Sequence, residues 1–191
     1  MSICLQKLKH AVAAAALMGA LAAHPVGAQE AGLEQAEAEL LALLQVVPAY
    51  EAEGIERELV ALWSRSGSKA LDFLLNRGRA ALRDGDIDLA IEHLTAVTDH
   101  APNFAEGWNA RAIAYYQAGL YGPSIADIQR TLSLNPNHFG AMAGLAIMLE
   151  DMGDYSNALK VQRQVRAIHP TRASVTEAIA RLERLSGEQD L

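Results

Sequence analysis

The chain has 191 residues, of which 51% are hydrophobic but only 5% aromatic, and its formal net charge is −7. This composition favours helices rich in alanine and leucine over a β core, and the length fits one domain. An acidic chain is poorly suited to nucleic acid, whose phosphates require basic contacts, so we expect no nucleic-acid partner.

Residues 1–28 have the three parts of a secretory signal peptide. Lys7 and Lys9 precede an apolar run from Ala11 to Ala23, and small residues follow up to a predicted cleavage near Ala28-Gln29. The run is shorter than the roughly 20 residues that span a bilayer, so we expect no membrane insertion of the mature chain. The short segment that precedes the apolar run is typical of bacterial signal peptides. We therefore expect the periplasm of a Gram-negative bacterium, with secretion as the second choice.

The only cysteine is Cys4, which precedes the apolar run and is expected to leave with the signal peptide. The mature chain would then hold no disulfide, no cysteine metal ligand and no cysteine nucleophile.

Residues 29–68 are predicted to form an acidic pair of helices and a loop. Apolar residues recur at helical spacing from Leu33 to Val47, Pro48 ends the run, and a second helix follows from about Tyr50 to Trp63. The pair is expected to act as a degenerate hairpin that covers the open end of the stack described next. Its glutamates are interpreted as a solvated face, with attraction of a basic partner as the alternative.

The next segment repeats with a period of 34 residues. Pro102, Pro136 and Pro170 mark the period, and the repeats run 71–104, 105–138 and 139–172 within a repeat region of residues 69–172. Small residues align at the predicted points of close helix contact, namely Gly78 facing Ala90 and Ala112 facing Ser124, and glycines align at the predicted turns, Gly85, Gly119 and Gly153.

This pattern resembles the tetratricopeptide repeat (TPR) family, whose period is about 34 residues. The middle repeat carries the resemblance best, with Trp108, Ala112, Tyr115, Gly119 and Pro136 at the family's signature positions. The resemblance implies an all-α solenoid of three helical hairpins with a concave binding surface. Residues 173–191 are predicted to form a capping helix and tail, because Val175, Ile179, Leu182 and Leu185 make one apolar stripe.

The resemblance also implies that the first helix of each hairpin lines the concave surface. We expect it to bind a peptide or protein segment of an unknown partner; the alternative is that the protein's own N-terminal helix fills it. The candidate residues are Leu75, Arg79, Leu82, Arg83, Asn109, Ile113, Tyr116, Gln117, Ile147 and Glu150.

Two further interpretations concern charged residues of the repeats. Family members that clamp a C-terminal carboxylate use cations and amides at positions that here hold Leu75, Arg79, Ala110, Gly140 and Gly144, so such a clamp is not expected. Arg77 and Arg111 replace the family's usual leucine. They either lie along the core and pair locally, or reach a ligand.

The sequence favours a protein that is not an enzyme and holds no metal or cofactor. It contains no nucleophile elbow and no phosphate-binding glycine loop. His93 and His100 share a helix face, but a zinc site would need a third ligand. We expect a scaffold or adaptor of the cell envelope. The alternatives are a permanently docked accessory subunit, self-assembly through the convex or end faces, and, from a different class, a metal carrier or enzyme.

Overall fold

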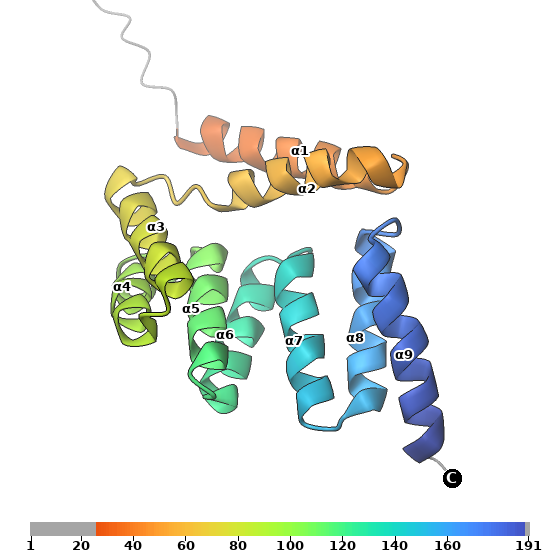
Figure 1. Ribbon diagram of the computed structural model, residues 1–191. Helices are drawn as coiled ribbons and strands as arrows, with labels where there is room; N and C mark the ends of the chain where they lie inside the picture. Colours follow the sequence, from red (N-terminus) through yellow and green to blue (C-terminus); the bar gives the residue numbers. More distant parts are fainter. Residues whose placement is uncertain (1–25, 190–191) are drawn as a thin grey trace, which may run out of the picture. The chain divides into compact units, whose positions relative to one another are not determined.

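The computed structural model describes residues 26–189, and the side-chain surroundings of residues 32–187. Most of the predicted signal peptide therefore lies outside the described residues. The chain divides into a unit of residues 1–35 and a unit of residues 36–191, and the description below concerns the second unit. The described residues contain helices and no strand, which confirms the all-α prediction (Figure 1).

Three helical hairpins form the repeat region. They consist of α3 (Lys69–Asp84) with α4 (Ile87–His100), α5 (Ala105–Gln117) with α6 (Tyr121–Leu134), and α7 (Phe139–Asp151) with α8 (Tyr155–Ile168). Three further helices flank them: α1 (Val26–Leu44) and α2 (Ala49–Trp63) on the N-terminal side, and α9 (Ala173–Gln189) on the C-terminal side.

Each hairpin turns at a glycine in the left-handed conformation. Gly85, Gly119 and Gly153 have φ values of 80°, 75° and 79°. In each turn the amide after the glycine donates to a carbonyl five residues back, as in Asp86 N to Ala81 O at 2.9 Å. A side chain with a Cβ is strained at this φ, which explains the glycine that recurs every 34 residues.

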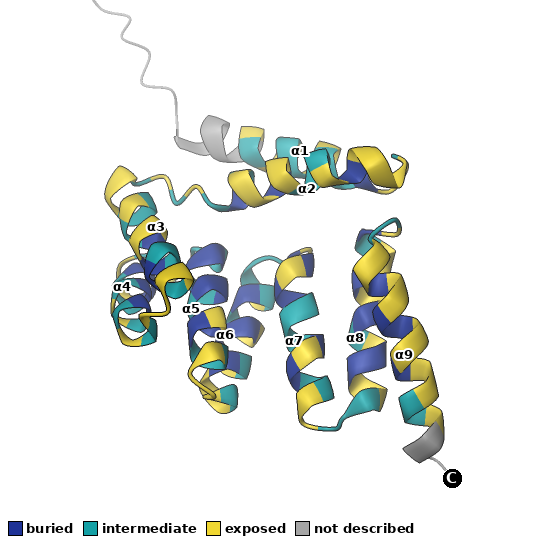
Figure 2. Ribbon diagram, in the orientation of Figure 1, coloured by how far each residue is buried: buried dark blue, intermediate teal, exposed yellow. Residues whose placement is uncertain are grey.

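Small residues allow the paired helices to approach closely, as the sequence predicts. A Cβ added to Gly78 would lie 2.5 Å from Cγ of Leu94, and Ser124 Oγ donates to Ala112 O at 2.7 Å. Leu94, rather than Ala90 alone, is therefore the side chain that requires a glycine at position 78. Buried residues line the contacts between helices along the whole stack (Figure 2).

The two arginines in the leucine position of the family differ from each other. The guanidinium of Arg111 makes two hydrogen bonds to Asp127, at 2.7 and 2.9 Å, and one to Thr98 at 2.8 Å. It also lies over the ring of Trp108, 4.8 Å from the centroid. Bonding to Asp127 raises the pKa of Arg111. Arg111 thus pairs locally, whereas Arg77 is exposed and has no interaction with another described residue.

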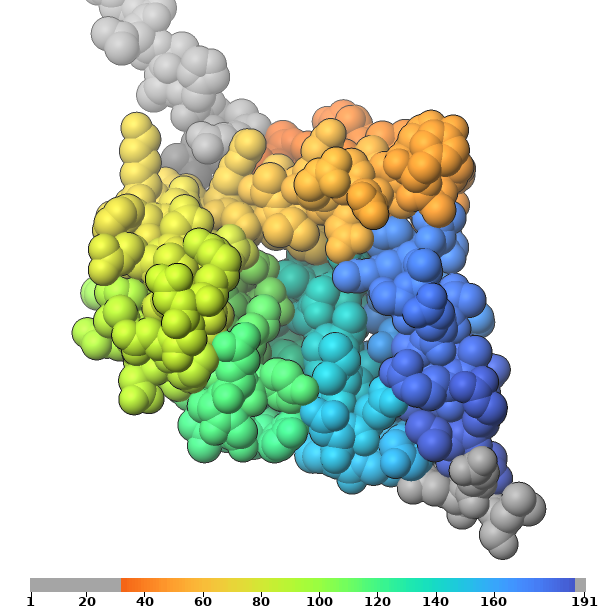
Figure 3. Space-filling view, viewed as in Figure 1, coloured from red at the N-terminus to blue at the C-terminus, as the bar shows by residue number. Residues whose placement is uncertain are grey.

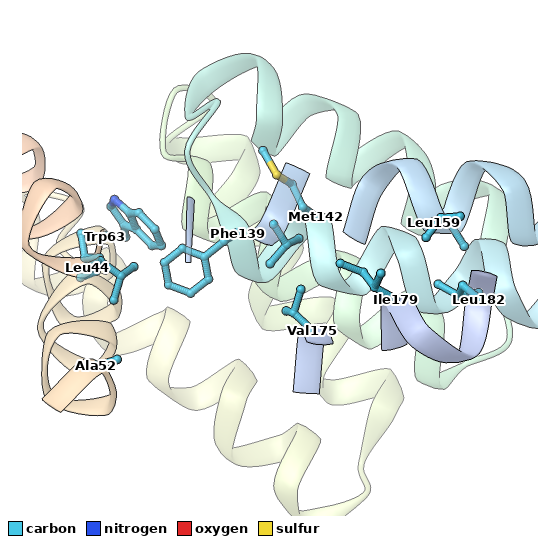
Figure 4. Close-up of a cluster of buried hydrophobic side chains, with 12 residues drawn as sticks. Leu44, Ala52, Trp63, Phe139, Met142, Leu159, Val175, Ile179 and Leu182 are labelled. Atoms are coloured by element: carbon cyan, nitrogen blue, oxygen red, sulfur yellow. The ribbon is translucent and has the colours of Figure 1, made fainter. Parts of the chain in front are cut away.

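The N-terminal helices occupy a different place from the expected one. Leu44, Ala52 and Trp63 share a core with Phe139, Met142 and Val175, which belong to the third repeat and the capping helix (Figure 4). Gln45 Nε2 donates to the carbonyls of Ala167 and Ile168 at the end of α8, at 2.8 and 2.6 Å. The prediction that the pair covers the end of the stack beside the first repeat is therefore wrong.

The physical reason lies in side chains that sequence periodicity does not connect. Trp63 at the end of α2 finds an aromatic partner in Phe139, 5.2 Å away between ring centroids, and this partner is two repeats further along the chain. Helix α2 consequently lies along the edge of the solenoid where one repeat connects to the next (Figure 1).

The close contact at Gly78 can be tested by adding one methyl group. Overpacking costs about 1–3 kcal/mol and exceeds the gain in helix propensity of up to about 1 kcal/mol. We expect Gly78→Ala to lower the free energy of unfolding by about 1 kcal/mol, measured by urea denaturation. Gly54→Ala in α2 is the matched control, because nothing lies within 4 Å of its added Cβ. Equal stabilisation by the two substitutions would contradict the close approach.

Candidate concave binding site

The centre of the candidate surface consists of two isoleucines from successive repeats. Ile113 on α5 and Ile147 on α7 occupy the same position in their repeats, and their exposed fractions are 45% and 47%. Isolated exposed apolar residues are common, but these two lie at the same repeat position on two first helices that contact each other, and we call them the isoleucine strip. In Figure 3 the face seen is hollowed between α3 and α9, below α2.

Polar groups beside the isoleucines already have partners. Tyr116 Oη donates to Asp151 Oδ2 at 2.8 Å, and this hydrogen bond raises the pKa of Tyr116. Arg181 of α9 makes two hydrogen bonds to the carboxylate of Glu150, at 2.7 and 2.8 Å, which lower the pKa of Glu150. Gln117 is exposed, one turn of helix from Ile113. The structure thus brings together five of the ten predicted residues, on α5 and α7.

The other five predicted residues lie in different surroundings. Leu75 is fully buried in the core of the first hairpin, and Leu82 packs against the same core. Asn109 is 8% exposed and donates to Glu106. Arg79 is paired with Glu106, and Arg83 is exposed. Leu75 and Asn109 therefore cannot contact a partner without rearrangement of the core.

A buried polar cluster lies at the edge of the concave face nearest α2. The carboxylate of Glu106 accepts hydrogen bonds from Arg79 and Asn109 and from His138 Nε2 at 2.7 Å. The Nδ1 atom of His138 accepts from the Ala141 amide, so Nε2 must carry the hydrogen that Glu106 receives. The sequence offers no sign of this cluster, because its members come from two helices, α3 and α5, and from the turn between the second and third repeats.

The cluster fixes the last turn of α2. The indole of Trp63 stacks on the His138 ring with centroids 4.7 Å apart, and Arg79 donates to Ser64 Oγ at 3.1 Å. The end of α2 is thus held beside this cluster, while Ile113 and Ile147 remain about half exposed. Among the described residues, the N-terminal helix therefore does not fill the centre of the concave surface at Ile113 and Ile147.

Electrostatics hold Glu106 in its charged form. Burial alone would raise the pKa of this carboxyl, but the hydrogen bond from His138, the charge of Arg79 and the hydrogen bond from Asn109 together lower it. The one cation at the clamp positions, Arg79, is thereby neutralised by a carboxylate of the same chain.

A cleft of about 870 Å³ lies away from this surface, between α2 and the turn from α8 to α9. Two ion-pair contacts cross it: Glu56 lies 3.2 Å from His169 Nε2 and 3.3 Å from Arg172 Nη2. Three other polar atoms of its lining residues are buried without a hydrogen-bond partner among the described residues, namely His169 Nδ1, Thr171 Oγ1 and Arg172 Nη1. Burial lowers the pKa of His169, which is therefore neutral at pH 7. The contacts of Glu56 attach α2 to the end of the third repeat.

Within residues 26–189 no set of three histidines, cysteines or carboxylates is placed to hold a metal ion. His93 and His100 lie on α4, as expected, without a third ligand of this kind. Nor does this part of the chain contain a helix with the length and apolarity to cross a membrane.

Acidification tests the Glu106 cluster. A carboxyl whose pKa is depressed on folding stabilises the protein above its unfolded pKa of about 4.3, and this contribution is lost as the pH falls through the lower folded value. We expect the wild type to lose more stability between pH ~7 and pH ~3 than Glu106→Gln does, measured by urea denaturation. Glu53→Gln is the control, since its side chain is 84% exposed and should leave the pH dependence unchanged.

Comparison with known proteins places these features in a family. Residues 75–130 match the tetratricopeptide repeat family model. A TPR repeat-containing protein of Rhizobium etli is 30% identical over 140 residues, which cover 73% of this chain and 69% of that protein. The human SGT1 homolog is 34% identical over 80 residues, but this match spans only 22% of its length.

Solved structures show the same fold. The TPR domain of Sgt2 from Aspergillus fumigatus superposes with a TM-score of 0.60 at 21% identity, over 64% of this chain and 83% of that domain. MamA superposes over more of the chain, 82%, and over 86% of its own length, with a TM-score of 0.58 at 17% identity. The first TPR domain of Spaghetti (RPAP3), solved bound to the HSP90 peptide SRMEEVD, has a TM-score of 0.59 at 19% identity, over 61% of this chain and 93% of that domain. The period, the hairpins and the similarity to the Rhizobium protein agree, and the chain belongs to the tetratricopeptide repeat family.

Proposed function

We propose that the protein is a non-catalytic interaction module of the cell envelope that binds a segment of a partner protein on its concave face. The observation that carries the proposal is the exposed strip of Ile113 and Ile147 on successive repeats. A partner that covers these side chains gains the free energy of burying apolar surface, about 25 cal/mol per Å².

The surroundings of the strip define the chemistry of the partner. Gln117 is exposed and offers hydrogen bonds to a peptide backbone, while Glu150 and Asp151 are engaged with Arg181 and Tyr116. The segment that fits has apolar side chains spaced to reach neighbouring helices. Affinity then depends on these anchors more than on charge.

Recognition of an acidic chain terminus is not part of this proposal. The RPAP3 domain was solved with a peptide that ends in Glu-Glu-Val-Asp. Here Glu106 already pairs with Arg79, so an incoming carboxylate would have to displace a buried carboxylate of the same chain. We expect synthetic peptides with this ending to bind no more tightly than versions with an amidated terminus.

The role of the isoleucine strip can be tested by replacing its apolar side chains with charged ones. A photoreactive residue at Gln117, in cells of the native host, should capture a partner that mass spectrometry identifies. We expect Ile113→Asp and Ile147→Asp to weaken binding of that purified partner at least tenfold, since each buries a charge against apolar anchors. Tyr50→Ser, which changes another exposed side chain far from the strip, should leave binding intact.

The same variants distinguish a true contact from a folding defect. Both isoleucines are about half exposed, so their replacement should leave the urea midpoint nearly unchanged. Full binding by both aspartate variants would contradict the proposed surface.

The proposed location rests on the amino-terminal pattern alone. If the signal peptide is cleaved, intact-mass measurement of the protein from the periplasmic fraction of its host should give a chain that begins near Gln29. Retention of the full-length chain in the cytoplasm would overturn this part of the proposal and leave the binding surface unaffected.

A further inference from the structure

We propose that the open face of helix α3 binds a second copy of the same chain, with the two α3 helices antiparallel across a two-fold axis. This surface is distinct from the concave strip, and its function goes beyond the binding of a partner segment.

The repeats themselves show that this face of α3 is normally a packing surface. The third, seventh and tenth positions of the second repeat are Gly107, Arg111 and Ala114, and in α5 they pack against α4. A Cβ on Gly107 would lie 2.8 Å from Cγ1 of Val97, and Arg111 reaches Thr98. The preceding hairpin therefore covers this face of α5.

On α3 the same positions are uncovered. They hold Phe73, Arg77 and Ala80, and the N-terminal helices that could have stacked there pack instead against the third repeat. Phe73 is 61% exposed, and Arg77 is exposed. Phe73 also stands where the close-packed repeats have glycine or alanine, so no helix can approach α3 as closely as α4 approaches α5.

Five residues form a single stripe on this face. At 100° per residue, they lie within about 80° of the circumference of α3. In chain order they are Lys69, Phe73, Arg77, Ala80 and Asp84. The charges of Lys69, Arg77 and Asp84 have no interaction with another described residue. The stripe thus combines one large apolar side chain, one small residue and unpaired charges.

The two ends of the stripe are complementary to each other. Lys69 at one end is basic and Asp84 at the other is acidic, while Phe73 and Ala80 lie between them. The midpoint of positions 69 and 84 and the midpoint of positions 73 and 80 both fall between residues 76 and 77. An antiparallel copy centred there places each Lys69 opposite the other chain's Asp84, and each Phe73 against the other chain's Ala80. The two Arg77 residues are neighbours across the axis and make the one like-charge contact, but their side chains are long and exposed and can turn toward solvent.

Each of these contacts occurs twice, because a two-fold axis relates the two chains. This is the usual geometry of homodimers, in which one patch meets its own copy. The large Phe73 side chain requires a small residue opposite it, and Ala80 supplies one. A parallel arrangement would instead set like charges against each other at both ends of the helix.

The experiment measures mass by light scattering over a range of concentrations and compares charge variants. We expect a dimer whose dissociation constant rises at least tenfold in Phe73→Ser. Lys69→Glu and Asp84→Lys should each raise it about tenfold, because each sets like charges together. The double variant K69E/D84K should return it to near the wild-type value, since both ion pairs are restored in reverse.

Two further measurements separate this dimer from other arrangements. In a Cys4→Ser background, Asn76→Cys should form a disulfide between two chains under mild oxidation, because position 76 lies beside the axis. Tyr50→Ser is the control for loss of an exposed apolar side chain and should leave the dimer intact.

Several results would overturn the proposal. A single-chain mass at all concentrations would do so. Failure of the double charge variant to restore association would reject the antiparallel register. Crosslinks from position 73 to residues 26–35 of the same chain, or to a different protein, would show that another occupant covers α3.

Discussion

The contact of Trp63 with His138 and Phe139 determines which surfaces of this protein are covered. The indole stacks on His138 at 4.7 Å and meets Phe139 at 5.2 Å, and it thereby joins the end of α2 to the start of α7. With its end held there, α2 covers one edge of the solenoid. The first repeat keeps an open face, and the centre of the concave surface remains exposed.

Buried charges reinforce this attachment without making a binding site. Glu106, Arg79 and His138 satisfy one another beside Trp63, and Glu56, in the middle of α2, contacts His169 and Arg172. Removing one partner of such a group leaves the other charge uncompensated. The resulting loss of stability is much larger than the net stabilisation that the intact group provides. The clusters therefore fix the position of α2.

Arg77 and Arg111 show how one repeat position can serve two purposes. Arg111 is enclosed by Asp127, Thr98 and Trp108, since a preceding hairpin packs against its helix. Arg77 has no preceding hairpin in contact, and the residue aligned with Asp127 in its own repeat is His93. The same side chain is therefore a core element in the second repeat and an exposed cation in the first.

The sequence alone determined the helical class, the 34-residue period, the turns at Gly85, Gly119 and Gly153 and the close contact at Gly78, because each depends on local spacing or on one residue's conformational freedom. It also indicated the exposed Ile113 and Ile147, which follow from repeat position. It could not reveal that Leu75 and Asn109 are buried, or that Trp63 packs on Phe139. These depend on contacts between residues far apart in the chain, for which periodicity carries no signal, and only the tertiary structure decided them.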